Sequence, residues 1–160
     1  MPKSSAIPIS LRQSGLFCCW RSEEKNGRKT KIPYNPTTGQ RAQTNNPKTF
    51  TDFQTALRAV KQYNGLGFLI PDGMFTIDID NGRAEDDSLK KHAAEIVAMF
   101  EDCYTEWTPS NNGLHILGRA DGFSFDKSLY WMNNRQLGVE VYHAAGGCVV
   151  DRATSAHVRR

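Results

Sequence analysis

The segment "MFTIDIDNG", residues 74–82, places two aspartates on a stretch that otherwise has the pattern of a buried strand. Side chains alternate between the two faces of a strand, so Ile77 points to one face while Asp78 and Asp80 point to the other. Asp is a poor strand former, and two carboxylates on one face repel each other unless positive charge lies between them. The segment therefore predicts a half-buried strand whose polar face serves a site.

Apolar runs of strand length recur along the rest of the chain, separated by turn signals. The Asn26-Gly27 pair predicts a tight hairpin turn. Two prolines place residues 31–42 at a sheet edge that runs into a loop. Pro-Asp-Gly joins the runs at 65–70 and 74–80, which predicts that they pair as an antiparallel hairpin. Further expected strands lie at 15–21, 114–119, 138–143 and 148–151.

Two segments carry apolar side chains at helical spacing, and each begins with residues that favour a helix start. These are residues 49–63, with Thr49 or Thr51 as a cap, and residues 84–102, with Asp86 and Asp87. Together with the strands they predict an α+β fold, a mostly antiparallel sheet with two main helices on one face. The other face of the sheet is then left for a site.

Length and composition fit a single domain over residues 1–160. The 39% hydrophobic content is ordinary for a soluble globular protein, and no apolar run approaches the length of a membrane span. The N-terminus lacks the long apolar stretch of a signal peptide. We therefore expect a cytoplasmic protein with no membrane partner. None of its four cysteines has a Cys-x-x-Cys spacing, so we expect them to be reduced.

Charge divides unevenly along the chain. Residues 1–63 hold 11 Lys and Arg against 3 Asp and Glu, whereas residues 64–160 hold 9 against 14. A basic half beside an acidic half suggests a polyanion at one surface and cations at another. Chance segregation of surface charge explains the counts equally well.

A third carboxylate, Glu140, lies within the apolar pattern Val-Glu-Val. If its strand neighbours that of Asp78 and Asp80, the three carboxylates form a hard-oxygen cage suited to Mg²⁺ or Mn²⁺. Such a cage holds the metals that activate a hydroxyl and stabilise a leaving pyrophosphate in nucleotidyl transfer. The alternative for an isolated Asp-x-Asp is a solvated strand face or a turn.

A small-residue turn, "SNNG", precedes a histidine on a predicted strand. Ser110, Asn112 and Gly113 belong to this turn, whose backbone N–H groups suit a phosphate. His115 points to the face opposite its apolar neighbours. A lone histidine in such a place is more often a core or surface residue than a ligand, but beside a carboxylate pair its imidazole can donate to a triphosphate.

The order of these motifs resembles the N-terminal primase-polymerase domain of phage and plasmid replication proteins, in the archaeo-eukaryotic primase superfamily. The motifs are "KIPYNPTTGQRA", a helix, "GLGFLI", "IDID", a second helix, "TEWTPSNNGLHI" and "VEVY". The resemblance covers about residues 20–142. It implies an RRM-like catalytic core that makes primers and extends DNA from nucleoside triphosphates, in a bacterial or phage-infected cell.

The resemblance also implies roles for particular residues. Asp78 and Asp80 match the metal-binding pair and Glu140 the third acid, so these three catalytic residues would hold two Mg²⁺ or Mn²⁺ ions. His115, with Ser110, Asn112 and Gly113 of the preceding turn, matches the nucleotide-binding segment. Lys31 matches a basic residue expected near the template or the incoming nucleotide.

The expected partners are a DNA template with its primer and nucleoside triphosphates. The basic half, through residues such as Lys29, Lys31 and Arg41, would bind DNA phosphates with release of counterions. A replicative helicase is a candidate further partner, and we expect a monomer.

Two departures from the family pattern bear on activity. The family has Ser-Gly where this chain has Ser110-Asn111, although Asn tolerates left-handed backbone. Residues 143–160 lack the family's Arg-aromatic pair and Thr-Gly. A truncated chain, a standalone domain and a relic that binds without synthesis all agree with this divergent end.

Three functions therefore remain in competition. A template-directed nucleotidyltransferase is favoured by the intact acids, since a module that only binds DNA has no need of three carboxylates near phosphate. A non-catalytic module that binds nucleotides or single-stranded DNA is favoured by the divergent end. An unrelated α+β domain with coincidental acids is the third.

Overall fold

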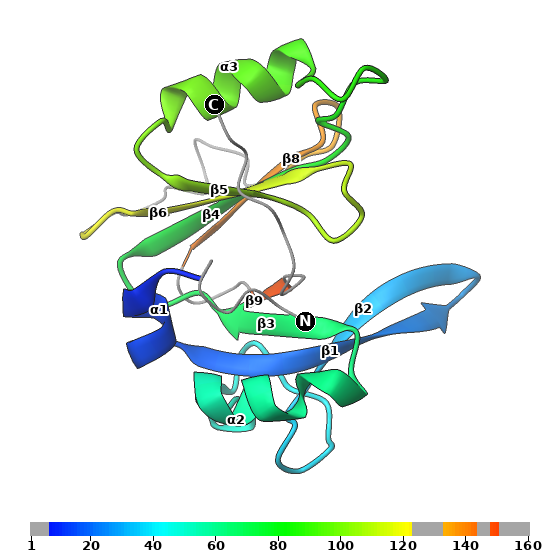
Figure 1. Cartoon of the computed structure of the whole chain (residues 1–160), viewed down its shortest axis with the longest axis vertical. Coiled ribbons are helices and arrows are strands. Elements are labelled where there is room, and N and C mark those ends of the chain that lie inside the picture. The colour runs from blue at the N-terminus through cyan, green and yellow to red at the C-terminus, as the bar shows by residue number, and fades with distance from the viewer. Residues whose placement is uncertain (1–6, 123–132, 144–147, 151–160) are drawn as a thin grey trace. The chain divides into compact units, whose positions relative to one another are not determined.

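The computed structural model describes residues 7–122, 133–143 and 148–150. These residues form two compact units (Figure 1). The first unit holds the described residues up to Pro71 together with 148–150, and the second holds those from Asp72 to His143. The single domain expected from the sequence stays a prediction.

The first unit is a four-stranded antiparallel sheet in the order β2-β1-β3-β9. Its strands are β1 (Leu16–Lys25), β2 (Arg28–Tyr34), β3 (Gly65–Leu69) and β9 (Cys148–Val150). Its helices are α1 (Ile9–Ser14), α2 (Phe53–Ala59) and two 3-10 turns, η2 (Pro47–Thr49) and η3 (Val60–Gln62). The hairpin predicted at Asn26-Gly27 is confirmed, because both residues have positive φ, 53° and 72°, as a tight turn between β1 and β2 requires.

The second unit is a five-stranded antiparallel sheet in the order β5-β6-β4-β8-β7. The elements are β4 (Met74–Ile79), α3 (Lys91–Met99), β5 (Tyr104–Trp107), β6 (Leu114–Arg119), β7 (Asn133–Asn134) and β8 (Val139–His143). The strand that carries Asp78 is therefore central, with a hydrogen-bonded neighbour on each side (Figure 1). The predicted α+β class with antiparallel sheets is confirmed.

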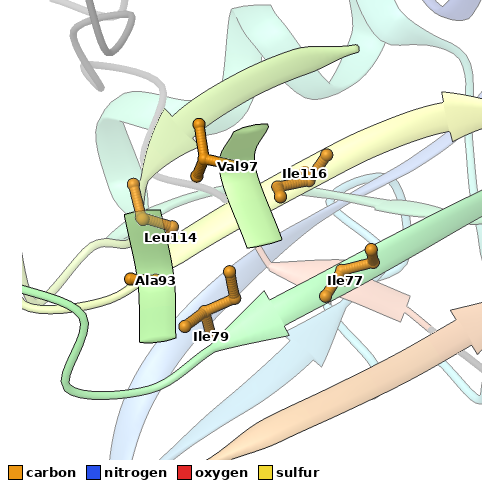
Figure 2. Close-up of a cluster of buried hydrophobic side chains, with 6 residues drawn as sticks. All are labelled: Ile77, Ile79, Ala93, Val97, Leu114 and Ile116. Atoms are coloured by element: carbon orange, nitrogen blue, oxygen red, sulfur yellow. The ribbon is translucent and has the colours of Figure 1, made fainter. Parts of the chain in front are cut away.

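One face of this second sheet packs against α3 (Figure 2). The buried cluster combines side chains of β4, β6 and α3, namely Ile77, Ile79, Leu114, Ile116, Ala93 and Val97. Burying such side chains stabilises the unit by about 1.5–3 kcal/mol for each large residue. Because side chains alternate along a strand, the residues between these apolar positions, Asp78 and His115 among them, lie on the face away from α3.

The predicted hairpin of residues 65–70 with 74–80 is wrong, because β3 pairs with β1 and β9 whereas β4 pairs with β6 and β8. β3 is buried from Gly65 to Phe68, and the part of β1 opposite it is buried from Phe17 to Trp20. β4 alternates and suits a sheet with one polar face. The expectation of both helices on one face of one sheet is wrong too, because α2 packs on β1 through Phe53 and Phe17, whose rings lie 5.1 Å apart.

Both helices are shorter than predicted. Asp52 caps α2 by accepting from the Thr55 backbone N–H at 2.9 Å, and the predicted cap Thr51 instead pairs its backbone with Phe17. The other predicted cap lies in η2, where the Thr49 hydroxyl donates to a carbonyl at 2.7 Å.

The predicted start of the second helix is a turn. Asp86 accepts from the backbone and hydroxyl of Ser88, and Asp87 has a φ of 68°, so turn chemistry wins over helix at these residues. The helix begins at Lys91.

Three cysteines, Cys18, Cys19 and Cys103, are free thiols, as expected. Burial raises the pKa of Cys19 to about 12 and so keeps this thiol protonated. The side chain of Cys148 lies outside the description. Over the described stretches of the chain, α-helices are too short and too polar to reach across a bilayer.

Candidate active site on the five-stranded sheet

A row of polar side chains crosses all five strands of the second sheet. Asp78 on β4 lies directly opposite His115 on β6 and Glu140 on β8. Glu106 on β5 is opposite His115, and Asn133 on β7 is opposite Glu140. Opposed residues of an antiparallel pair share a face, so all five project from the side away from α3. The expectation that Asp78, His115 and Glu140 lie on neighbouring strands and share a face is confirmed, and the same expectation for Asp80 stays a prediction.

Asp80 follows the end of β4, and its backbone N–H donates to the Gly138 carbonyl at 2.7 Å. Its carboxylate is exposed, and its negative charge affects the hydroxyl of Tyr142, as do the charges of Asp78 and Glu140. The pKa of Tyr142 is raised, first by burial, then by the hydrogen bond to Glu140 and by the negative charges of Glu140, Asp78 and Asp80. The three predicted metal-binding acids are therefore close enough to share an electrostatic neighbour.

Glu140 is held from two directions. The amide of Asn133 and the hydroxyl of Tyr142 both donate to its carboxylate. Hydrogen bonds to a charged acceptor contribute about 1.5–3 kcal/mol each, so this carboxylate is held firmly in one orientation.

His115 is buried, 5% exposed, between two carboxylates. Its Nδ1 lies 3.3 Å from Glu106 Oε1, and its Nε2 lies 3.8 Å from Asp78 Oδ1. Glu106 is only 2% exposed and also accepts from the Tyr104 hydroxyl at 2.8 Å. Neither Glu106 nor Tyr104 was predicted from the sequence, although a carboxylate within the strand pattern "YTEW" is the same signal that identified Glu140.

The turn between β5 and β6 is built largely from its own hydrogen bonds. Asn111 N–H donates to the Thr108 carbonyl at 2.8 Å, and Gly113 N–H donates to the Thr108 hydroxyl at 3.1 Å. The same hydroxyl lies 3.0 Å from that of Ser110. Two of the turn's N–H groups are thus committed within the chain, which leaves less of it for a phosphate than the sequence suggested.

The turn's backbone fits its residues. Asn111 has a φ of 59°, so the Asn that replaces the expected Gly adopts the left-handed backbone. A Cβ at Gly113 would come within 2.5 Å of the Ile79 carbonyl oxygen, at the end of the strand that carries Asp78. Only glycine allows the turn to lie this close to β4. Asn112 is exposed, and its carbonyl accepts from the Arg83 N–H at 3.2 Å.

A hollow of about 380 Å³ lies beside Asp80. Its walls come from the residues after β4, from α3 and from the loop between β7 and β8, namely Asp80, Asn81, His92, Arg135, Gln136, Leu137 and Gly138. Its volume falls in the range of small-molecule sites, about 300–1,000 Å³. It combines an acid with the exposed cation Arg135, which suits a ligand that carries both metal and phosphate.

The three acids are the right kind of ligand for a hard cation, but their side chains do not converge on one point. Asp78, Asp80 and Glu140 are the oxygen ligands that Mg²⁺ and Mn²⁺ prefer. Among the residues that the structure describes, no group of three or more His, Cys, Asp or Glu side chains is placed to hold an ion. Each Glu140 oxygen accepts one hydrogen bond, from Asn133 or from Tyr142, and keeps a second lone pair that an ion could use.

The residues predicted to bind DNA lie in the first unit. Lys29 and Lys31 share a face of β2, and Lys31 Nζ lies 5.7 Å from the centre of the Trp20 ring. Arg41 contacts Glu23 at 2.7 Å, and Glu23 lies on the opposite face of the hairpin. The three cations therefore do not form one patch. The expected contact of Lys31 with a nucleotide stays a prediction.

Comparison with known proteins adds a relative. No protein-family model matches the chain. The chain is 35% identical over 112 residues to the "DNA Primase-polymerase" of Nitratiruptor phage NrS-1. The match covers 68% of this chain and 15% of that protein, so the chain spans only a small part of its relative's length. The sequence and its relative together show that this chain is related to a phage DNA primase-polymerase.

Proposed function

We propose that this chain carries out metal-dependent, template-directed nucleotidyl transfer from nucleoside triphosphates, as the catalytic domain of a DNA primase-polymerase. The observation that carries the proposal is the polar row of the second sheet, where Asp78 lies directly opposite both Glu140 and His115. The printed name of the phage relative supports the same activity. In this proposal the five-stranded sheet is the RRM-like core of an archaeo-eukaryotic primase.

The acids of the row have a defined task in this reaction. Asp78, Asp80 and Glu140 would hold two Mg²⁺ or Mn²⁺ ions. Such ions, when bound, activate the primer hydroxyl and stabilise the charge of the leaving pyrophosphate. Tyr142 and Asn133 orient Glu140 through their hydrogen bonds.

In this proposal His115 contacts the triphosphate. Its Nδ1 faces Glu106, so Nε2 is the ring atom turned toward Asp78 and the acids. A donor at this position can hold a phosphate oxygen beside the ions. The hollow next to Asp80, with Arg135 on its wall, has the size and charge to hold the rest of the nucleotide.

The first unit would bind the DNA template and primer. Lys29 and Lys31 are exposed on one strand face, where Lys31 lies over the ring of Trp20. On the opposite face of the hairpin, the Arg21 guanidinium of β1 lies 4.5 Å from the ring centre of Tyr63 and 5.4 Å from that of Tyr34. Cations interleaved with aromatic rings are the usual surface for single-stranded nucleic acid. A replicative helicase would act with the domain at a fork, and the chain would work as a monomer.

A second candidate, a module that binds nucleotides or single-stranded DNA without catalysis, is favoured by one observation. Glu140 already accepts hydrogen bonds from Asn133 and Tyr142, and the described acids do not converge on an ion site. A module of this kind would keep the hollow and the basic hairpin and would not need the ions.

Primer extension separates the two candidates. The chain is incubated with a primed DNA template, ribo- or deoxyribonucleoside triphosphates, and Mg²⁺ or Mn²⁺, beside a reaction without primer. We expect incorporation that requires the metal and is lost in Asp78→Asn. Asp72→Asn, which changes an exposed carboxylate of the same unit, is the matched control and should incorporate normally. Binding of triphosphate without any incorporation would favour the module.

A further inference from the structure

We propose that Glu106 is a positioning residue that sets the orientation of His115 toward the triphosphate, an inference that rests on the proposed function. Glu106 would act through the imidazole ring and would touch neither the nucleotide nor the ions. The evidence is the continuous contact from the Tyr104 hydroxyl to Glu106 and from Glu106 to His115 Nδ1.

The burial of Glu106 needs an explanation. A carboxylate at 2% exposure loses nearly all of its hydration, which is costly unless hydrogen bonds replace it. Glu106 Oε2 accepts from Tyr104 at 2.8 Å, and Oε1 faces His115 Nδ1 at 3.3 Å. A buried apolar residue would stabilise the strand without this cost. The arrangement is therefore better explained by what it does to His115 than by stability.

The effect on His115 follows from the symmetry of the ring. Rotation by about 180° about the Cβ–Cγ bond exchanges the two sides of an imidazole, so burial alone does not decide which atom faces the acids. Glu106 decides it, because its Oε1 lies 3.3 Å from Nδ1 and holds the ring with this nitrogen turned toward β5. Nε2 is then the atom that faces Asp78, at 3.8 Å.

A binding cycle tests the inference. The affinity for ATP and for dATP is measured in EDTA by calorimetry for the unmodified chain, Glu106→Gln, His115→Ala and the double variant. When a partner that fixes a metal-binding histidine is removed, affinity typically falls about 10–100-fold, and we expect the low end, roughly tenfold, for Glu106→Gln. If Glu106 acts through His115, the change should have no further effect once His115 is alanine. An equal loss in both backgrounds would overturn the inference.

Two further variants guard against a simple loss of fold. Tyr104→Phe removes one donor to Glu106 and keeps the ring, so it should give a smaller loss of affinity in the same direction. Glu85→Gln, at an exposed position of the same unit, is the matched control and should change nothing. Far-ultraviolet circular dichroism and thermal melts report whether each variant keeps the fold.

The nitrogen shifts of His115 test the inference on the unmodified chain. Nitrogen-15 spectra should show a proton on Nδ1, with an Nδ1 shift that changes in Glu106→Gln. A neutral ring protonated only on Nε2, or an Nδ1 shift indifferent to Glu106→Gln, would overturn it. This result is independent of catalysis. The chain could show the expected Nδ1 proton, and no effect of Glu106→Gln once His115 is alanine, yet incorporate no nucleotide. That outcome refutes the proposed function and leaves the role of Glu106 in place.

Discussion

Replacing both strand aspartates, Asp78→Asn with Asp80→Asn, should stabilise the metal-free chain while it abolishes incorporation. Asp78 lies directly opposite Glu140, a position at which side-chain Cβ atoms are about 4.5–5.5 Å apart. Two unit charges at about 5 Å repel by roughly 0.8 kcal/mol in water and by about 3 kcal/mol at an effective dielectric constant of 20.

Partial exposure places the expected gain near the lower of these values. The Asp78 side chain is 31% exposed and Asp80 is exposed, so we expect a gain of about 1 kcal/mol. For a chain of this size that gain is a rise in melting temperature of roughly 2–4 °C. Loss of the contact between Asp78 Oδ1 and His115 Nε2, which lie 3.8 Å apart, opposes this gain.

Thermal melts with and without Mn²⁺ then test the metal assignment. An ion present at about 100 times its dissociation constant stabilises the unmodified chain by about 2.7 kcal/mol, or roughly 5–10 °C. The double variant should show no such rise, and the exposed control Asp72→Asn should match the unmodified chain in both conditions. A double variant that melts well below the unmodified chain in EDTA refutes the repulsion argument. One that keeps the Mn²⁺-dependent rise refutes the assignment of Asp78 and Asp80 as ligands.

Two further predictions concern the ligands. Lys29→Gln with Lys31→Gln should weaken single-stranded DNA binding and reduce the slope of log K against log salt by about 1.4, since each phosphate contact to a single strand contributes about 0.7. Arg41→Gln should change the slope less, because Arg41 is paired with Glu23, and equal effects in a filter-binding titration would contradict this. Arg135→Gln should lower triphosphate affinity by about 1 kcal/mol or more through the lost charge beside the hollow, measured by calorimetry. Arg119→Gln, an exposed arginine of the same unit, should leave that affinity unchanged, and a loss of equal size there would show that only net charge matters.

The strand that carries the acids was predictable because its signal is local. Alternation of apolar and polar residues was enough to predict that Ile77 and Asp78 point to opposite faces of the strand. The pattern around Glu140 predicted a second strand that carries a carboxylate among apolar residues. The Asn26-Gly27 hairpin was predictable for the same reason, since two residues determine the turn.

Pairings that depend on distant segments were not predictable from local pattern. Pro-Asp-Gly suggested that β3 and β4 pair with each other. Instead β3 pairs with β1 in the first sheet and β4 pairs with β6 in the second, and the burial of each strand matches that of its partner. Turn chemistry at Asp86 and Asp87 displaced a helix start that composition favoured. Glu106 was missed because its importance lies in a contact with His115, nine residues away, that only strand pairing creates.

The central place of β4 has a consequence for motion. From Phe75 to Ile79 this strand is paired on both edges, and its apolar side rests on α3. Its amides can therefore exchange with solvent only when the sheet itself opens, so they should be among the slowest in the unit. Asp78 would thus lie on one of the least mobile backbone segments of the unit, and Asp80, just past the strand end, is joined to the loop before β8 by its backbone hydrogen bond to Gly138. Asp78 would therefore keep its position relative to His115 and Glu140, its partners on β6 and β8, whenever a ligand enters or leaves the site.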